Sequence, residues 1–307
     1  KLPPNLLTFD FNSNTKAYGI SKLPKYLKWL NVSGTGISSV SDIKCETSDK
    51  NFPNLLYFNA SSSNIESLSG ISSRFPVLTD LHCSSTKLEG DLPSLPSSLK
   101  NVSLSSNNID SIQGSLPTDL ETMTISLNGL STMPRIPDNC KSLTVDGKRQ
   151  TGPEPDKEVT YQNPLENWSI SSGEGKSLTF LSLNNIETFP QNIHNLTALK
   201  DIRSNNVSIN GSLPIMPETL EYAYFNGCGL TSLAGFTNNE NLRTVHVSNN
   251  FLTSLAPLEK SRETIHDLIV SFNDLEDNSE ADFSVFTNSM YRLDVGYNKL
   301  KKFTSPE

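Results

Sequence analysis

The sequence of 307 residues has few cysteines, few charges and no long apolar run. Only four residues are cysteine and 19% are charged, with 25 basic against 33 acidic side chains and a net charge of −8. A helix that spans a bilayer needs about 20 consecutive apolar residues, whereas the longest apolar stretches here, such as residues 55–58, are far shorter. We therefore expect no membrane insertion. Because no segment gathers the basic residues that phosphate binding requires, we also expect no nucleic-acid partner.

Signatures of catalysis and of metal binding are also missing. The motifs GxSxG, HExxH and GxxxxGKS/T do not occur, there is no CxxC pair, and the four histidines are dispersed. Such a sequence favours a non-enzyme without metal or cofactor. His246 and Asp267 resemble a base and its orienting acid, but no nucleophile or metal ligand completes the group. We interpret them as surface residues that face a ligand.

What the sequence does contain is leucine and asparagine, 39 and 32 residues respectively. Both recur in an eleven-residue block, LxxLxLxxNxL. The clearest copies begin at Leu99, Leu120, Leu242 and Met290, and weaker ones begin at Leu6, Leu27, Leu55, Leu78, Cys140, Leu178, Leu199, Leu220 and Ile265. About thirteen copies in register predict a repeat architecture.

Each part of the block has a physical role. In LxL both leucines point to one side and the residue between them points to the other, which is the pattern of a half-buried strand. One such strand cannot bury its apolar face alone, so the copies must stack and pair their strands in parallel. The asparagine at the ninth position follows the strand, where its amide can serve backbone groups that have no strand partner.

This block resembles the leucine-rich-repeat family over nearly the whole chain. Segments such as DLPSLPSSL before Leu99 and GSLPIMPETL before Leu220 resemble the LPxLPxxL linkers of short bacterial repeats. The resemblance implies a curved, right-handed and mostly β solenoid of the α/β repeat type. One parallel sheet would form its concave face, and extended segments or short helices would form its convex returns.

The repeats predict one domain over residues 1–307, with about thirteen copies and an irregular interruption at about residues 146–175. The cysteines fall on apolar or small positions of the block, or in a return between copies. We expect them to be small buried side chains rather than disulfide partners or zinc ligands.

Function in a solenoid is expected on the extended concave sheet. The third, fifth and seventh positions of each block should point outward there. Among the C-terminal copies these positions and their neighbours concentrate aromatic, arginine and charged residues, the types that dominate binding energy. The predicted partner-binding residues are Arg203, Tyr222, Tyr224, Arg243, His246, His266, Asp267, Tyr291, Arg292 and Asp294.

A second cluster at the N-terminal end contains Trp29 and Tyr57. An exposed tryptophan beside a tyrosine suits a protein anchor or a sugar ring, but Trp29 could equally help to cap the end of the solenoid. We include Trp29 and Tyr57 among the predicted partner-binding residues and keep both interpretations open.

The sequence favours a recognition module that binds a macromolecule, most simply a protein, as a monomer or weak dimer. The alternatives are a carbohydrate-binding or adhesive surface protein, and the targeting part of a larger effector whose activity lies outside this chain. The polar composition favours an extracellular or cell-surface location, and the scarcity of cysteine also fits a cytoplasmic one.

Overall fold

The computed structural model describes residues 2–47, 51–150, 160–277, 286 and 290–302. The chain divides into two compact units, Lys1–Val145 and Asp146–Glu307, which we call the N-terminal unit and the C-terminal unit. The boundary coincides with the start of the predicted interruption. The organisation of residues 1–307 as one domain remains a prediction.

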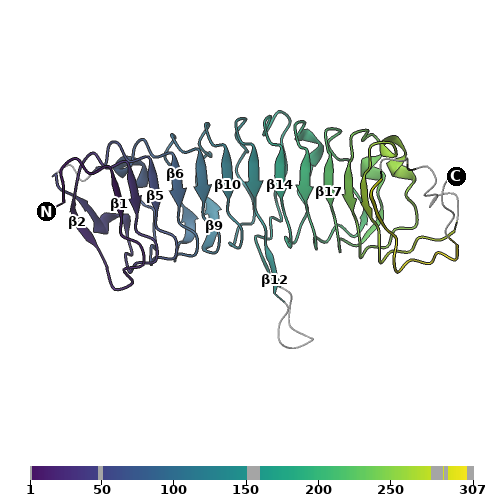
Figure 1. The fold of residues 1–307 in the computed structure, drawn as a ribbon, viewed down its shortest axis with the longest axis horizontal. Coiled ribbons are helices and arrows are strands. Elements are labelled where there is room, and N and C mark those ends of the chain that lie inside the picture. The colour runs from purple at the N-terminus through teal and green to yellow at the C-terminus, as the bar shows by residue number, and fades with distance from the viewer. Residues whose placement is uncertain (1, 48–50, 151–159, 278–285, 287–289, 303–307) are drawn as a thin grey trace. The chain divides into compact units, whose positions relative to one another are not determined.

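Parallel strands lie side by side in the N-terminal unit (Figure 1). Each strand is three residues long and hydrogen-bonds in register with the next, in chain order. The strands are β1 (Thr8–Asp10), β3 (Trp29–Asn31), β5 (Tyr57–Asn59), β6 (Asp80–His82), β8 (Asn101–Ser103), β10 (Thr122–Thr124) and β11 (Ser142–Thr144).

The C-terminal unit repeats this arrangement, again with parallel pairing in chain order. Its strands are β14 (Phe180–Ser182), β15 (Asp201–Arg203), β17 (Tyr222–Tyr224), β19 (Thr244–His246), β20 (Asp267–Ile269) and β21 (Arg292–Asp294). Each of the thirteen predicted copies contributes one strand that begins two residues after its first apolar position. The predicted class, a mostly β repeat solenoid, is confirmed.

The returns between these strands are extended segments and short helices, as predicted. Three further parallel pairs join β2 (Ile20–Leu23) to β4 (Ile43–Cys45), β7 (Glu89–Leu92) to β9 (Asn108–Ile112), and β16 (Gly211–Ser212) to β18 (Leu230–Ser232). The helices are η1 (Val40–Asp42), α1 (Ile71–Arg74), η2 (Ile193–Asn195), η3 (Ala234–Phe236) and η4 (Ala256–Ser261). Within the described ranges, no helix is long and apolar enough to cross a bilayer.

The predicted interruption contains one antiparallel pair, β12 (Lys148–Gln150) with β13 (Thr160–Gln162). In the C-terminal unit it also contributes core residues, because Leu165, Trp168 and Ile170 are buried. The described part of the segment therefore combines an antiparallel strand pair with an irregular return.

The core follows the alternation of the block. The middle residue of each strand and the apolar residue two positions later point inward, so that Leu30 and Val32, or Leu268 and Val270, have no solvent exposure. Phenylalanines from strands and returns fill the space behind them, including Phe58, which lies 5.1 Å from Phe75 between ring centroids. The residues on either side of the middle residue point outward and form the outward face of each sheet.

Asparagine at the ninth position serves the backbone, as the sequence predicts. The Nδ2 group of Asn250 donates to the carbonyls of Phe225, Val247 and Ser248, at 2.8 to 3.1 Å. Its Oδ1 accepts hydrogen bonds from the amides of Cys228 and Leu230, both at 3.0 Å. One buried side chain thus satisfies five backbone groups in two adjacent copies.

Residues at the seventh position form a second ladder, which the sequence analysis did not anticipate. In the N-terminal unit the hydroxyl of Ser84 accepts from the amide of Ser105, and the hydroxyl of Ser105 accepts from that of Ser126, both at 3.1 Å. In the C-terminal unit Oδ1 of Asn205 accepts from the amide of Asn226, and Oδ1 of Asn226 accepts from the amide of Ser248. The small polar residues of this row therefore stabilise the stacking of copies.

All four cysteines are free and buried, which confirms that they are small buried side chains outside disulfides. Burial raises the pKa of the Cys83 thiol to about 12, and the pKa values of Cys140 and Cys228 to about 11. Because the thiolate is the reactive form, we expect these three thiols to resist iodoacetamide at pH 8 in the folded protein. Mass spectrometry should find all four labelled in denaturant. Rapid labelling of Cys83 in the folded protein would contradict the packing described here.

Candidate functional site

Strand register brings the predicted partner-binding residues of the C-terminal unit into two rows. The first row aligns Asp201, Tyr222, Thr244, Asp267 and Arg292, which occupy the third position of the block. The second row aligns Arg203, Tyr224, His246, Ile269 and Asp294, which occupy the fifth position. Side chains that are 21 to 25 residues apart in sequence are therefore neighbours on one face.

Arg203 is held between aromatic rings in the fifth-position row. Its guanidinium carbon lies 5.2 Å from the ring centroid of Phe180 and 5.3 Å from that of Tyr224, and its Nη2 lies 3.2 Å from Asp201 Oδ2. The hydrogen bond to Asp201 raises the pKa of the guanidinium, and burial is the main cause that raises the pKa of the Tyr224 phenol. On this face a guanidinium group thus contacts two aromatic rings and pairs with a carboxylate.

The contacts continue across the next strands. Tyr224 meets His246 edge to face, with ring centroids 4.9 Å apart. His246 Nε2 lies 3.1 Å from Asp267 Oδ2, with side chains that are 17% and 11% exposed. Arg292 Nη1 is 3.8 Å from the same carboxylate oxygen. Five of the predicted residues therefore form one continuous set of contacts.

The second position of the block adds a charged edge beside these rows. Glu221 lies 2.8 Å from Lys200 Nζ and 3.3 Å from Arg243 Nε. On the following strands the rings of His266 and Tyr291 lie 6.5 Å apart, and Tyr291 is 76% exposed. The structure thus places Arg243, His266 and Tyr291 along one border of the face.

The N-terminal cluster of Trp29 and Tyr57 also lies on the outward face of its sheet. Trp29 and Tyr57 stack with ring centroids 5.0 Å apart and an interplanar angle of 9°, and Tyr57 lies 5.1 Å from His82. Burial lowers the pKa of His82, although the Asp80 carboxylate acts in the opposite direction. Since β3 pairs with β1 as well as with β5, Trp29 lies within the outward row and does not form the end of the sheet.

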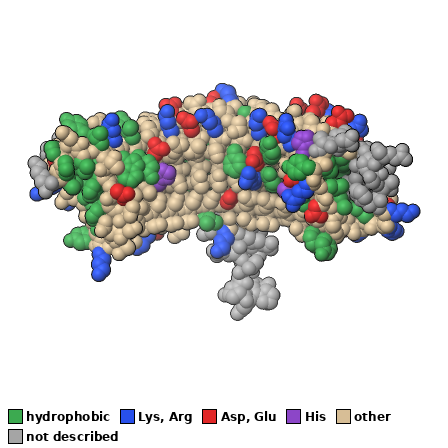
Figure 2. Space-filling model, viewed as in Figure 1, with side chains coloured by type: hydrophobic (Ala, Val, Ile, Leu, Met, Phe, Trp, Pro, Cys, Tyr) green, Lys and Arg blue, Asp and Glu red, His purple; other side chains and the backbone are tan. Residues whose placement is uncertain are grey.

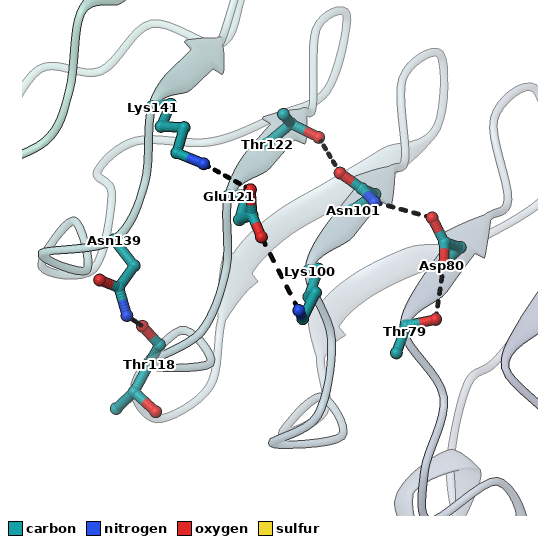
Figure 3. Close-up of polar contacts among 9 residues, drawn as sticks. All are labelled: Thr79, Asp80, Lys100, Asn101, Thr118, Glu121, Thr122, Asn139 and Lys141. Carbon is teal, nitrogen blue, oxygen red and sulfur yellow. Dashed lines mark hydrogen bonds and ion pairs between the residues drawn. The ribbon is translucent and has the colours of Figure 1, made fainter.

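The rest of the outward face of the N-terminal unit is polar and internally paired (Figure 3). Asn101 Nδ2 donates to Asp80 Oδ1, and Thr122 Oγ1 donates to Asn101 Oδ1, both at 2.7 Å. Beside this chain Glu121 lies between Lys100 and Lys141, at 3.9 and 2.6 Å. In Figure 2 the strands β8 to β11 are covered mainly by uncharged polar side chains, whereas charged and apolar side chains gather over the C-terminal strands.

Some residues of this surface were missed by the sequence analysis. Phe180 belongs to the copy with the most irregular spacing, so its contact with Arg203 was not anticipated. Phe272 was missed as well. Its ring stacks at 4.1 Å on Tyr297, which the sequence already placed beside the C-terminal rows, and Phe251 is exposed on the preceding copy. Phe272 and Tyr297 both occupy the eighth position, where most copies have Ser, Asn or Gly. That contrast was a signal available in the sequence.

The described residues contain no group of three or more His, Cys, Asp or Glu side chains that could hold a metal ion. A cavity of about 380 Å³ lies between two returns of the N-terminal unit, lined by residues that include Leu116, Arg135 and Asn139. Its lining contains none of the predicted partner-binding residues. The candidate site is therefore an outward protein surface.

Comparison with known proteins identifies the fold. No protein-family model matches the sequence, and no curated protein matches it. Among solved structures, a leucine-rich-repeat protein of Leptospira interrogans has a TM-score of 0.62 at 20% identity, over 91% of this chain and 75% of that one. The leucine-rich effector YopM of Yersinia pestis has a TM-score of 0.60 at 22% identity, over 99% and 81%. An internalin of Listeria monocytogenes has a TM-score of 0.59 at 13% identity, over 97% and 83%. The chain therefore has the fold of a leucine-rich-repeat solenoid.

Proposed function

We propose that this chain is a non-catalytic recognition module that binds a protein partner through the outward face of the C-terminal unit. This face is the one that we expect to be concave. The observation that supports the proposal is the contact set of Arg203, Tyr224, His246, Asp267 and Arg292. It combines a tyrosine ring and two guanidinium groups, residue types that carry much of the binding energy in protein interfaces, with a buried carboxylate.

Carbohydrate binding is the alternative class, and the N-terminal ring geometry argues against it. Sugars bind to the open faces of aromatic rings, but Trp29 and Tyr57 cover each other's faces at a 9° interplanar angle. The stack therefore leaves at most one face of each ring open to a sugar, and His82 lies 5.1 Å from Tyr57. A glycan array that shows binding by the wild type, and none by a Trp29→Ala variant, would favour the alternative over a protein partner.

Quantitative affinity capture tests the proposal. We compare the wild type with the triple variant Tyr222→Ala, Tyr224→Ala, Arg243→Ala, and with a control variant Thr122→Ala, Thr124→Ala from the polar strand β10. We expect a protein that the wild type and the control bind alike, and that the triple variant binds at least about 30-fold more weakly. Circular dichroism should show that both variants are folded. Equal binding by all three proteins would place the site elsewhere.

A further inference from the structure

Unsatisfied polar atoms gather under the outward face of the C-terminal unit. His246 Nε2, His266 Nδ1 and Asp267 Oδ1 are buried without a hydrogen-bond partner, and all three lie on the adjacent strands β19 and β20 or directly before them. In a folded protein such an atom lowers stability, because it has lost its hydrogen bonds to water without gaining others. Buried polar groups are normally paired, and these atoms are closed to solvent. A partner from outside the chain can therefore reach Asp267 only when the exposed side chain of Arg292, 3.8 Å from its carboxylate, moves aside.

Asp267 is the most deeply placed acid of this face. Along the third-position row Thr244 and Asp267 are buried, at 7% and 8% exposure, while Tyr222 on one side and Arg292 on the other are exposed. The two shorter side chains thus lie between longer ones. We expect the outward surface to be lowest over β19 and β20.

Asp267 is also the acid with the weakest pairing. Asp201 accepts a hydrogen bond from Arg203, Glu221 accepts one from Lys200, and Asp294 accepts one from the amide of Gly296. Among the residues that the structure describes, the carboxylate of Asp267 has two charged neighbours. Arg292, whose side chain is 56% exposed, lies 3.8 Å away, and His246 lies 3.1 Å away without hydrogen-bond geometry. A buried carboxylate needs a closer cation than these.

A guanidinium group meets this need best. It supplies several N–H donors in a plane, matches a carboxylate with two parallel hydrogen bonds, and stacks on aromatic rings. The same face already contains this arrangement in Arg203, which is held by Asp201 and by the rings of Phe180 and Tyr224. The ring of His246 contacts Asp267, and the ring of Tyr224 contacts His246 in turn.

We infer that Asp267 anchors an arginine side chain of the protein partner, in a site bordered by Tyr224, His246 and Arg292. This inference rests on the proposed function, because it names the group that the partner presents. The incoming guanidinium displaces Arg292, whose Nη1 lies 3.8 Å from the carboxylate of Asp267. It then donates to that carboxylate the hydrogen bonds that Arg292 does not make.

Blocked amino acids serve as probes, so the partner need not be known. N-acetyl-arginine amide is titrated into the whole chain while NMR follows the ring signals of His246 and Tyr224. We expect saturable shifts with a dissociation constant of about 1–10 mM, the range for a single side chain. The citrulline analogue, which has the same shape without the charge, should bind at least about tenfold more weakly. Equal binding of the two probes would overturn the inference without any variant.

Two variants complete the test. Asp267→Asn keeps the size of the side chain and should weaken arginine binding at least about tenfold, whereas Glu259→Gln, which removes an exposed acid on η4, should leave it unchanged. Because Asp267→Asn removes a buried charge, its midpoint of unfolding should be no lower than that of the wild type. Unchanged arginine binding by Asp267→Asn would overturn the inference.

The outcome is separable from that of the capture experiment. If arginine does not bind but the triple variant still loses its protein partner, the proposed function stands and the role of Asp267 is wrong. If arginine binds through Asp267 but the triple variant retains every partner, the site is real and the proposed protein-binding face is wrong.

Discussion

Replacing Asn250 by alanine is expected to lower the free energy of unfolding of the C-terminal unit by about 3–5 kcal/mol. The side chain is 5% exposed and makes hydrogen bonds to five backbone groups. Alanine removes these bonds and leaves buried carbonyls and amides without a partner, and no water can replace the amide unless the copies separate. Stability in a stacked repeat depends on the interfaces between neighbouring copies, and three of the five bonds of Asn250 cross the interface to the preceding copy.

Urea unfolding followed by circular dichroism measures the loss. Asn241→Ala is the matched control, because that asparagine is exposed and makes only one long hydrogen bond, of 3.4 Å. Asn250→Thr should be intermediate. Thr35 occupies the same position of the block, and its hydroxyl keeps one of the carbonyl contacts, at 2.7 Å to Val32. If Asn250→Ala and Asn241→Ala unfolded at the same urea concentration, the ladder would have no structural role.

The strands were predictable because their signal is local. An apolar residue at every second position fixes which side chains face inward, and thirteen repetitions fix the register of one copy on the next. The outward rows follow directly, so the sequence indicated that Tyr224, His246 and Asp294 share a row. It could not show which of them touch, because contact depends on rotamers and on residues such as Phe180 from other copies.

The ninth position shows where pattern alone is misleading. When the copy that begins at Leu178 is aligned to the block by sequence, one residue is missing before its asparagine. In the structure Asn185 has the positive φ of 57° that marks the eighth position, so buried Ile186 fills the ninth. The copy is complete, and an apolar residue replaces the asparagine there. The alignment of this copy to the block therefore depends on its backbone conformation, which cannot be read from the sequence.

The left-handed backbone conformation at the eighth position was another feature that the sequence analysis did not predict. Ser, Asn and Gly accept positive φ at little cost, and Ser106, Asn206 and Gly227 have it. Phe272 and Tyr297 adopt the same conformation, with φ of 57° and 55°. Large side chains at this position are uncommon, so the repeat imposes its conformation on them, and their rings are directed to the surface.

Two returns of the C-terminal unit approach each other closely at Gly235, and the second large effect is expected there. Gly235 lies in η3 and is buried against the return that contains Leu213 and Pro214. A Cβ atom at this glycine would overlap the carbonyl oxygen of Pro214, and would lie 2.8 Å from its carbonyl carbon and 2.9 Å from Leu213 O. These are backbone atoms, and Pro214 has a fixed φ. Gly235→Ala is therefore expected to cost about 3–5 kcal/mol of stability.

Gly296→Ala tests whether this cost comes from the close approach or from losing a glycine. Gly296 lies in the same unit without a positive φ, and an added Cβ atom would come no closer than 3.2 Å to the end of the Asp294 side chain, which can move. Both substitutions restrict the unfolded chain equally, so any difference in their urea midpoints reports on the folded state. We expect Gly296→Ala to unfold close to the wild type, and Gly235→Ala to unfold at a much lower urea concentration or to accumulate as aggregate. Equal midpoints would mean that the returns of the C-terminal unit can move apart at little cost, and that the strands alone hold the copies together.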